Sequence, residues 1–158
     1  ASPVVERVDF DFRKYGYALC IIDSGADHAD LTDEYAAITL ELKAVCAYFD
    51  KDVLTQIDEA EFYAKIPELR KQCGDRAVMR SIHFYQENAR VPRQVAALRE
   101  GNFDKFLMLV KQSGYSSYMY LQNVIPAGRK EKQEVAFALT ISVTEYSAPC
   151  SNEILLIA

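Results

Sequence analysis

The N-terminal segment alternates between apolar and polar residues. Val8, Phe10 and Phe12 fall on one side of an extended chain, and the charged residues between them fall on the other. This period of two predicts a half-buried strand over residues 4–12. A glycine-containing turn then leads into a more apolar run at residues 17–22, which we expect to be a second, buried strand.

Beyond residue 32 the apolar residues recur at steps of three and four. This spacing places them on one face of a helix. It predicts a helix to about residue 49, helical segments over 58–73 that Pro67 divides, and a long helix over 76–99 with a kink at Pro92. Residues suited to helix ends stand at the expected boundaries: Asp30 or Thr32, Asp58, Gly74, Gly101 and Asn102.

The rest of the chain is less regular. A short helix from residue 103 is expected to end at Gly114, within an aromatic and hydroxyl-rich turn at 113–121. Residues 126–142 favour a further helix, and residues 153–158 a strand. The order of strand, strand, helices and strand indicates an α+β fold, with helices packed on one face of a small antiparallel sheet.

Composition fits one domain over residues 1–158. Half of the residues are hydrophobic, and the net charge of −5 with no arginine-rich stripe argues against nucleic acid or an anionic membrane as a partner. No apolar run approaches the ~20 residues of a membrane span, and no signal peptide is recognised. A cytoplasmic location is expected, with four widely spaced, reduced cysteines: Cys20, Cys46, Cys73 and Cys150. The chain has no initiator methionine, which fits either its removal or a piece of a longer polypeptide.

Candidate chemistry is sparse. The two histidines have no cysteine partner nearby, and the aspartates at residues 23–33 lack the spacing of a calcium loop, so we expect no metal site. No phosphate loop, dinucleotide fingerprint or nucleophile elbow occurs, and we predict no catalytic residue. Arg76 and Arg80, one turn apart, could bind an anion or form helix-face ion pairs. Tyr35 stands where a strand gives way to a helix, a common place for ligands, although a core tyrosine is the alternative.

Two stretches resemble galactokinases, members of the GHMP kinase superfamily. Residues 24–35, SGADHADLTDEY, resemble the segment in which a strand runs into a helix through His, Leu and Glu-Tyr. Residues 80–90, RSIHFYQENAR, and then 95–106, VAALREGNFDKF, resemble a helix with Arg, His, Glu and Arg followed by Ala-Leu, Gly-Asp and Phe. The resemblance spans about residues 17–123 and identifies the C-terminal half of a galactokinase, with the fold of the C-terminal domain of GHMP kinases.

The resemblance implies an activity for the complete enzyme: transfer of the γ-phosphoryl group of ATP to the C1 hydroxyl of galactose, with Mg²⁺. In that family the catalytic aspartate, its partner arginine and the phosphate-binding loop belong to the N-terminal half. None of those motifs occurs here, so this chain alone is expected to bind neither ATP nor Mg²⁺ and to be inactive. The implied partners are galactose or a related sugar and the chain's own N-terminal domain. Self-association through an exposed interdomain face is also expected.

The resemblance also assigns roles to single residues. The Glu-Tyr pair places Tyr35 where the family's tyrosine hydrogen-bonds galactose, and His28 and Asp33 are implied to orient it. The residues that match the family's helix are expected to be structural: Arg80, His83, Glu87 and Arg90.

Three departures from the family pattern keep other functions open. Residues 36–39 replace arginines that follow Glu-Tyr, Ser113-Gly114 replaces a Ser-His pair, and residues 148–153 replace a glycine-rich segment beside the active site. The alternatives are a non-catalytic galactokinase-like sugar sensor and a protein-interaction domain.

Overall fold

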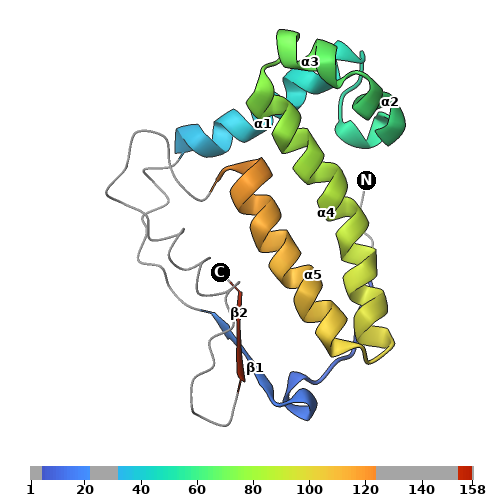
Figure 1. The fold of residues 1–158 in the computed structure, drawn as a ribbon, viewed down its shortest axis with the longest axis vertical. Helices are drawn as coiled ribbons and strands as arrows, with labels where there is room; N and C mark the ends of the chain where they lie inside the picture. Colours follow the sequence, from blue (N-terminus) through green and yellow to red (C-terminus); the bar gives the residue numbers. More distant parts are fainter. Residues whose placement is uncertain (1–4, 22–31, 124–152, 158) are drawn as a thin grey trace.

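A computed structural model describes residues 5–21, 32–123 and 153–157, and this part of the chain is mostly helical (Figure 1). The α-helices are α1 (Thr32–Tyr48), α2 (Glu59–Ala64), α3 (Ile66–Gln72), α4 (Asp75–Arg99) and α5 (Phe103–Ser116). Short 3₁₀ helices are η1 (Phe12–Tyr15) and η3 (Leu54–Gln56), η4 (Ser117–Leu121) is a π-helical turn, and the strands are β1 (Tyr17–Ile21) and β2 (Glu153–Ile157).

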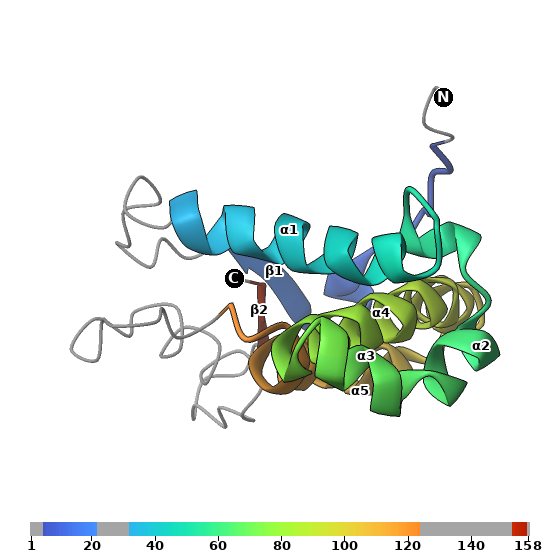
Figure 2. The ribbon, with the colours of Figure 1, turned by 90° about the horizontal axis from the view of Figure 1, so that it is seen from above.

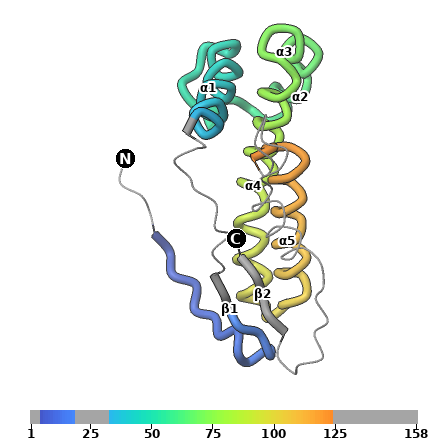
Figure 3. Tube along the Cα trace, turned by 90° about the vertical axis from the view of Figure 1, so that its left-hand side faces the viewer, coloured from blue at the N-terminus to red at the C-terminus, as the bar shows by residue number. Residues whose placement is uncertain are grey.

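Helix α4 is the centre of the arrangement. Helix α5 runs back along it, and α1 crosses over its first part, as Figures 1 and 2 show. Helices α2 and α3 gather at the end where α4 begins. The two strands lie near the opposite end, where α4 turns into α5 (Figure 3).

The predicted antiparallel sheet covered on one face by helices is wrong. Within the described residues, β1 and β2 form a two-stranded parallel pair, with Tyr17 opposite Glu153 and Ile21 opposite Ile157. The described part is therefore a helical assembly with one short strand pair, not an α+β sheet fold. Apolar runs at residues 17–22 and 153–158 correctly indicated strands, but such runs carry no information on strand direction. Parallel pairing needs a long crossover, which the intervening helices supply.

The predicted strand over residues 4–12 is also wrong. Residues 5–11 have no regular structure, and η1 follows them. The alternation has another cause: Phe10 stacks on Phe103 with ring centroids 5.6 Å apart, while the intervening charges stay in water. We call residues 5–17 the N-terminal arm; its aromatic side chains pack against the start of α5.

Two hydrophobic cores lie at the two ends of α4. The first core consists of Val45, Cys46, Leu54, Ile57, Phe62, Leu69, Ala77, Val78 and Tyr85. The second core consists of Ala97, Phe103, Phe106 and Leu109, with partly buried neighbours that include Phe10, Phe12 and Tyr17 from the arm.

Several helix ends follow the predictions. Asp58 accepts a hydrogen bond from the backbone N–H of Glu61, and Asn102 accepts one from that of Lys105, each at 3.1 Å. Gly101, with φ of +67°, ends α4 in a Schellman arrangement in which the Asn102 N–H reaches the Ala97 carbonyl at 2.9 Å. An added Cβ there would also lie 3.2 Å from the Tyr15 hydroxyl, so the tyrosine side chain would have to shift slightly.

The prolines and Gly114 were predicted with mixed success. The chain breaks between α2 and α3, and Pro67 stands in the first turn of α3, where its missing N–H costs little. Helix α4 continues through the exposed Pro92. The predicted end at Gly114 is wrong, because α5 runs to Ser116 and continues into η4, which Gln122 caps with φ of +56°. The helix predicted at 126–142 lies outside the described residues.

Candidate functional site

The residues with an implied sugar contact fall at the start of α1. Asp33 and Tyr35 stand in its first turn and both are exposed, Tyr35 by 48%. Tyr35 is thus not a core tyrosine. The acidic residues Asp33 and Glu34 suit this position, since the N-terminal end of a helix carries positive partial charge. His28 lies outside the described residues.

The two halves of α1 differ in their packing. No residue from 33 to 40 is buried. Farther along the helix, Val45 and Cys46 are buried in the first core, and Leu42 packs against it. The half that carries Tyr35 therefore extends beyond the core that holds the other half.

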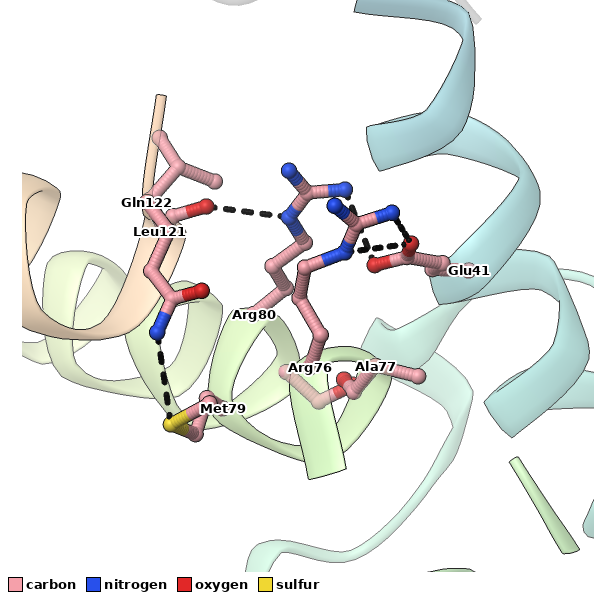
Figure 4. Close-up of polar contacts among 8 residues, drawn as sticks. Glu41, Arg76, Ala77, Met79, Arg80, Leu121 and Gln122 are labelled. Atoms are coloured by element: carbon pink, nitrogen blue, oxygen red, sulfur yellow. Dashed lines mark hydrogen bonds and ion pairs between the residues drawn. The ribbon is translucent and has the colours of Figure 1, made fainter. Parts of the chain in front are cut away.

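Glu41 marks the boundary between these halves, and its carboxylate joins two arginines of α4 (Figure 4). Arg80 Nη1 donates to Glu41 Oε2 at 2.8 Å, and Arg76 Nε donates to Glu41 Oε1, also at 2.8 Å. The hydrogen bond to Glu41 raises the pKa of Arg76. Both carboxylate oxygens are thus occupied, and the anion site considered for Arg76 and Arg80 is filled by the chain's own Glu41.

Arg80 also reaches a third element. Its side chain is 1% exposed, and its Nε donates to the Leu121 carbonyl at 2.9 Å (Figure 4). Leu121 ends η4, where backbone carbonyls lack partners within the helix. One buried guanidinium therefore links α1, α4 and the end of η4. Removing a partner from such a group is costly, because it leaves a buried charge uncompensated.

A second polar layer joins α4 to α5. His83 Nδ1 lies 2.9 Å from Ser116 Oγ, and Ser116 Oγ lies 3.3 Å from Gln86 Oε1. If the serine donates to the amide oxygen, His83 Nδ1 carries the proton that it donates to the serine. Burial, and then the charge of Arg90, lower the pKa of His83.

One turn farther along α4, Ser113 Oγ donates to Glu87 Oε2 at 2.8 Å, and Glu87 forms an ion pair with Arg90. Burial is the main cause that lowers the pKa of Arg90. Arg80, His83 and Glu87 thus contact elements outside α4, and Arg90 pairs with Glu87 within it. These contacts fit the structural role expected for the four motif residues.

Sequence reasoning missed Glu41. The signal was present: Ile38, Leu42, Val45 and Phe49 define the apolar face of α1, and Glu41 stands on the same face at helical spacing. A lone carboxylate on an apolar face requires a partner, and here that partner is Arg80.

The side chains that the structure describes offer neither a metal-binding cluster nor a reactive thiol. Among them, no group of three or more His, Cys, Asp and Glu side chains could hold a metal ion. Burial raises the thiol pKa of Cys46 and of Cys73, which keeps these sulfurs protonated and poor as nucleophiles. The helices in this part of the chain are too short or too polar to span a membrane.

Comparison with known proteins points to sugar kinases. The chain is 30% identical over 98 residues to the galactokinase of Glaesserella parasuis serovar 5, a match that covers 62% of this chain and 25% of that protein. It is 29% identical over 99 residues to the galactokinase of Actinobacillus pleuropneumoniae serotype 3, covering 63% of this chain and 26% of that protein. No protein-family model and no solved structure matches.

These matches define a distant sugar-kinase relationship. The chain is galactokinase-like over about 100 residues, and it spans about a quarter of the length of the curated relatives it matches.

Proposed function

We propose that this chain is the C-terminal part of a galactokinase-like sugar kinase of the GHMP superfamily. Joined to an N-terminal part, it would phosphorylate galactose at C1 with ATP. The similarity to two galactokinases over about 100 residues carries this proposal. ATP and Mg²⁺ are assigned to the N-terminal part, because the family resemblance puts the phosphate-binding and catalytic motifs there. A cytoplasmic location fits this role.

The chain's own contribution is one wall of the sugar pocket. The Tyr35 hydroxyl can donate and accept hydrogen bonds, which suits a ring of sugar hydroxyls. Its exposed position on the first turn of α1 leaves it accessible to a ligand. Asp33, exposed on the same turn, and His28, in the preceding segment, are proposed to orient the sugar or the tyrosine.

A sugar sensor is the second candidate, and the departures at residues 36–39 favour it. This stretch reads Ala-Ala-Ile-Thr, so α1 offers no cation where the family has arginines. A protein that binds galactose without turning it over would meet this description.

An exposed apolar strip on α5 and η4, which includes Met108, Tyr115 and Met119, is a surface suited to the N-terminal domain or to self-association.

The test measures ADP release from Mg-ATP and galactose by the complete polypeptide, with Tyr35→Phe as the variant. Losing one hydrogen bond of about 1.4 kcal/mol should raise the galactose KM about tenfold and leave the ATP KM unchanged. Tyr63→Phe is the matched control, since Tyr63 is also a partly exposed tyrosine but lies on α2.

The outcomes separate the candidates. Turnover with a selective rise in galactose KM supports the kinase and the role of Tyr35. Galactose binding by calorimetry without turnover supports the sensor. Neither binding nor turnover by the complete polypeptide would overturn both. Sedimentation of the 158-residue chain as a monomer at high concentration would count against self-association.

A further inference from the structure

The start of α1 extends beyond the first core. Residues 33–40 contain no buried side chain, whereas the first core holds the helix from Leu42 onward. Tyr35 lies less than two turns before Glu41, about 9 Å along the helix axis at 1.5 Å per residue. The contacts that α1 makes at Glu41 and beyond therefore help to set the direction of this segment.

Such an arrangement amplifies small errors. A tilt of about 10° at Glu41 moves a point about 9 Å away by roughly 1.6 Å. Hydrogen bonds span only ~2.7–3.2 Å between heavy atoms, so that displacement would break a contact made by the Tyr35 hydroxyl. Accurate positioning at Glu41 is thus a condition for any sugar contact at Tyr35.

Arg80 is suited to provide this accuracy, and Arg76 is not. The Arg80 side chain is buried, and its rigid guanidinium holds Glu41 of α1 and the Leu121 carbonyl at the same time. The Arg76 side chain is 44% exposed, and its charge interacts with Glu41 and, more weakly, with Glu34. Arg80 therefore fixes α1 against a second, independent element.

We propose that Arg80 and Glu41 are positioning residues that set the direction of the first two turns of α1 and thereby place Tyr35 against the sugar. This inference rests on the proposed function for the identity of the ligand. The mechanical part, that Arg80 orders residues 33–40, stands on the geometry alone.

The first experiment compares Arg80→Lys with Arg76→Lys in the complete polypeptide. Lysine keeps the charge, but one ammonium group cannot reproduce the fork that spans Glu41 and Leu121. Arg80→Lys should raise the galactose KM about tenfold and change the ATP KM less than twofold. Arg76→Lys should change both less than twofold. An equal rise in both KM values would indicate a general structural defect and would overturn the positioning role.

The second experiment requires no turnover. Native-state hydrogen exchange should show faster exchange of the amides at 36–40 in Arg80→Lys, with Val78 and other amides of the first core unchanged. Arg76→Lys should leave both regions unchanged. If Arg80→Lys fails to fold, Glu41→Gln replaces it, because glutamine keeps the shape and an acceptor oxygen but removes the charge. Unchanged exchange at 36–40 in the folded variant would overturn the proposal.

The two experiments separate the two proposals. Faster exchange at 36–40 in Arg80→Lys, together with no galactose binding or turnover by the unsubstituted polypeptide, would leave the positioning role intact and refute the sugar-kinase function. Galactose turnover by the unsubstituted polypeptide, with the galactose KM and the exchange at 36–40 unaffected by Arg80→Lys, would support the sugar-kinase function and refute the positioning role.

Discussion

The two ends of α4 are stabilised in different ways. The first core draws its buried residues from one continuous stretch, residues 45–85, through helices that follow one another in the chain. The second core combines residues 97–110 with the distant N-terminal arm, whose rings are only partly buried. The first core is thus completed by residues close to one another in the chain, and the second by the N-terminal arm, which is distant from it in sequence.

This difference predicts unequal local stability. Contacts between neighbouring segments require little loop closure, whereas docking the arm orders residues far from their partners in sequence. The arm also offers fewer buried contacts, which is typical of regions that open before the whole molecule unfolds. We expect the second core to open without the first, and not the reverse.

The largest effect should come from Phe62→Ala in the first core. Phe62 has no exposed surface and its ring lies 5.0 Å from that of Tyr85. Loss of this side chain should lower the free energy of unfolding by about 3–5 kcal/mol, because it leaves a cavity among several helices. Urea unfolding of the 158-residue chain, followed by its helical circular dichroism, measures the change.

The neighbouring Tyr63 provides the control for that change. Its side chain is 39% exposed, so Tyr63→Ala should cost clearly less than Phe62→Ala. Equal losses at the two positions would contradict the assignment of Phe62 to a closed core.

A smaller and more local effect is expected from Phe10→Ala in the arm. The Phe10 ring contacts Phe12, Tyr15 and Phe103 at centroid distances of 5.1, 5.0 and 5.6 Å, but it is only partly buried. We expect a loss of about 1–2 kcal/mol, from incomplete burial and aromatic pairing. Hydrogen exchange should accelerate in residues 8–18 and leave the first core unchanged.

Val5→Ala is the matched control in the arm. Val5 is 87% exposed and should contribute almost nothing. If Phe10→Ala accelerated exchange equally at both ends of α4, the two cores would be one cooperative unit and the comparison would fail.

The same contrast explains what the sequence could reveal of the fold. Helix ends depend on a few neighbouring residues, so Asp58, Gly101 and Asn102 were correctly placed from local chemistry. The helix end predicted at Gly114 was wrong because contacts with α4 stabilise the helix there. The hydroxyls of Ser113 and Ser116 hydrogen-bond to side chains of α4 and hold α5 in a helix on either side of the glycine. Strand direction and the partner of the arm depend on distant segments, which a local pattern does not encode.

In the candidate site, too, local features could be predicted from the sequence and long-range contacts could not. Tyr35 and Asp33 were predicted as sugar contacts from a short motif, and the structure adds that both are exposed. The pair between Glu41 and Arg80, which lies between helices 39 positions apart in the chain, could not be assigned from spacing. Glu41 on the apolar face of α1 indicated only that a polar or charged partner must exist, not which residue it is.

The helix caps test the comparison with matched changes. Asp58→Ala removes the cap of α2 at the first core, and Asn102→Ala removes the cap of α5 at the second. Each should cost about 1 kcal/mol in global stability. Hydrogen exchange should separate them, since Asn102→Ala is expected to loosen residues 103–106 together with the arm, and Asp58→Ala only residues 59–64. Loosening of the arm by Asp58→Ala would contradict the independence of the two ends.

The smallest expected effect concerns the polar layer between the two cores, and it depends on pH. His83 faces Ser116 of α5, whose hydroxyl also contacts Gln86, and burial and Arg90 hold the pKa of His83 below the ordinary value of 6.5. The folded state therefore binds a proton less readily than the unfolded state. Stability contributed by neutral His83 is complete above pH 6.5 and declines as the pH falls from there toward the pKa of the folded state.

His83→Gln isolates this contribution. Glutamine can still hydrogen-bond Ser116 but does not titrate near neutral pH, so the variant should lose less stability than the unsubstituted chain between pH 7.5 and pH 5.5 in urea unfolding. His28→Gln is the matched control, because His28 is the other histidine of the chain. A decline with pH that persists in His83→Gln and disappears in His28→Gln would move the titrating group away from the α4–α5 layer. A decline that disappears in His83→Gln and persists in His28→Gln would assign this pH dependence to the polar layer between α4 and α5.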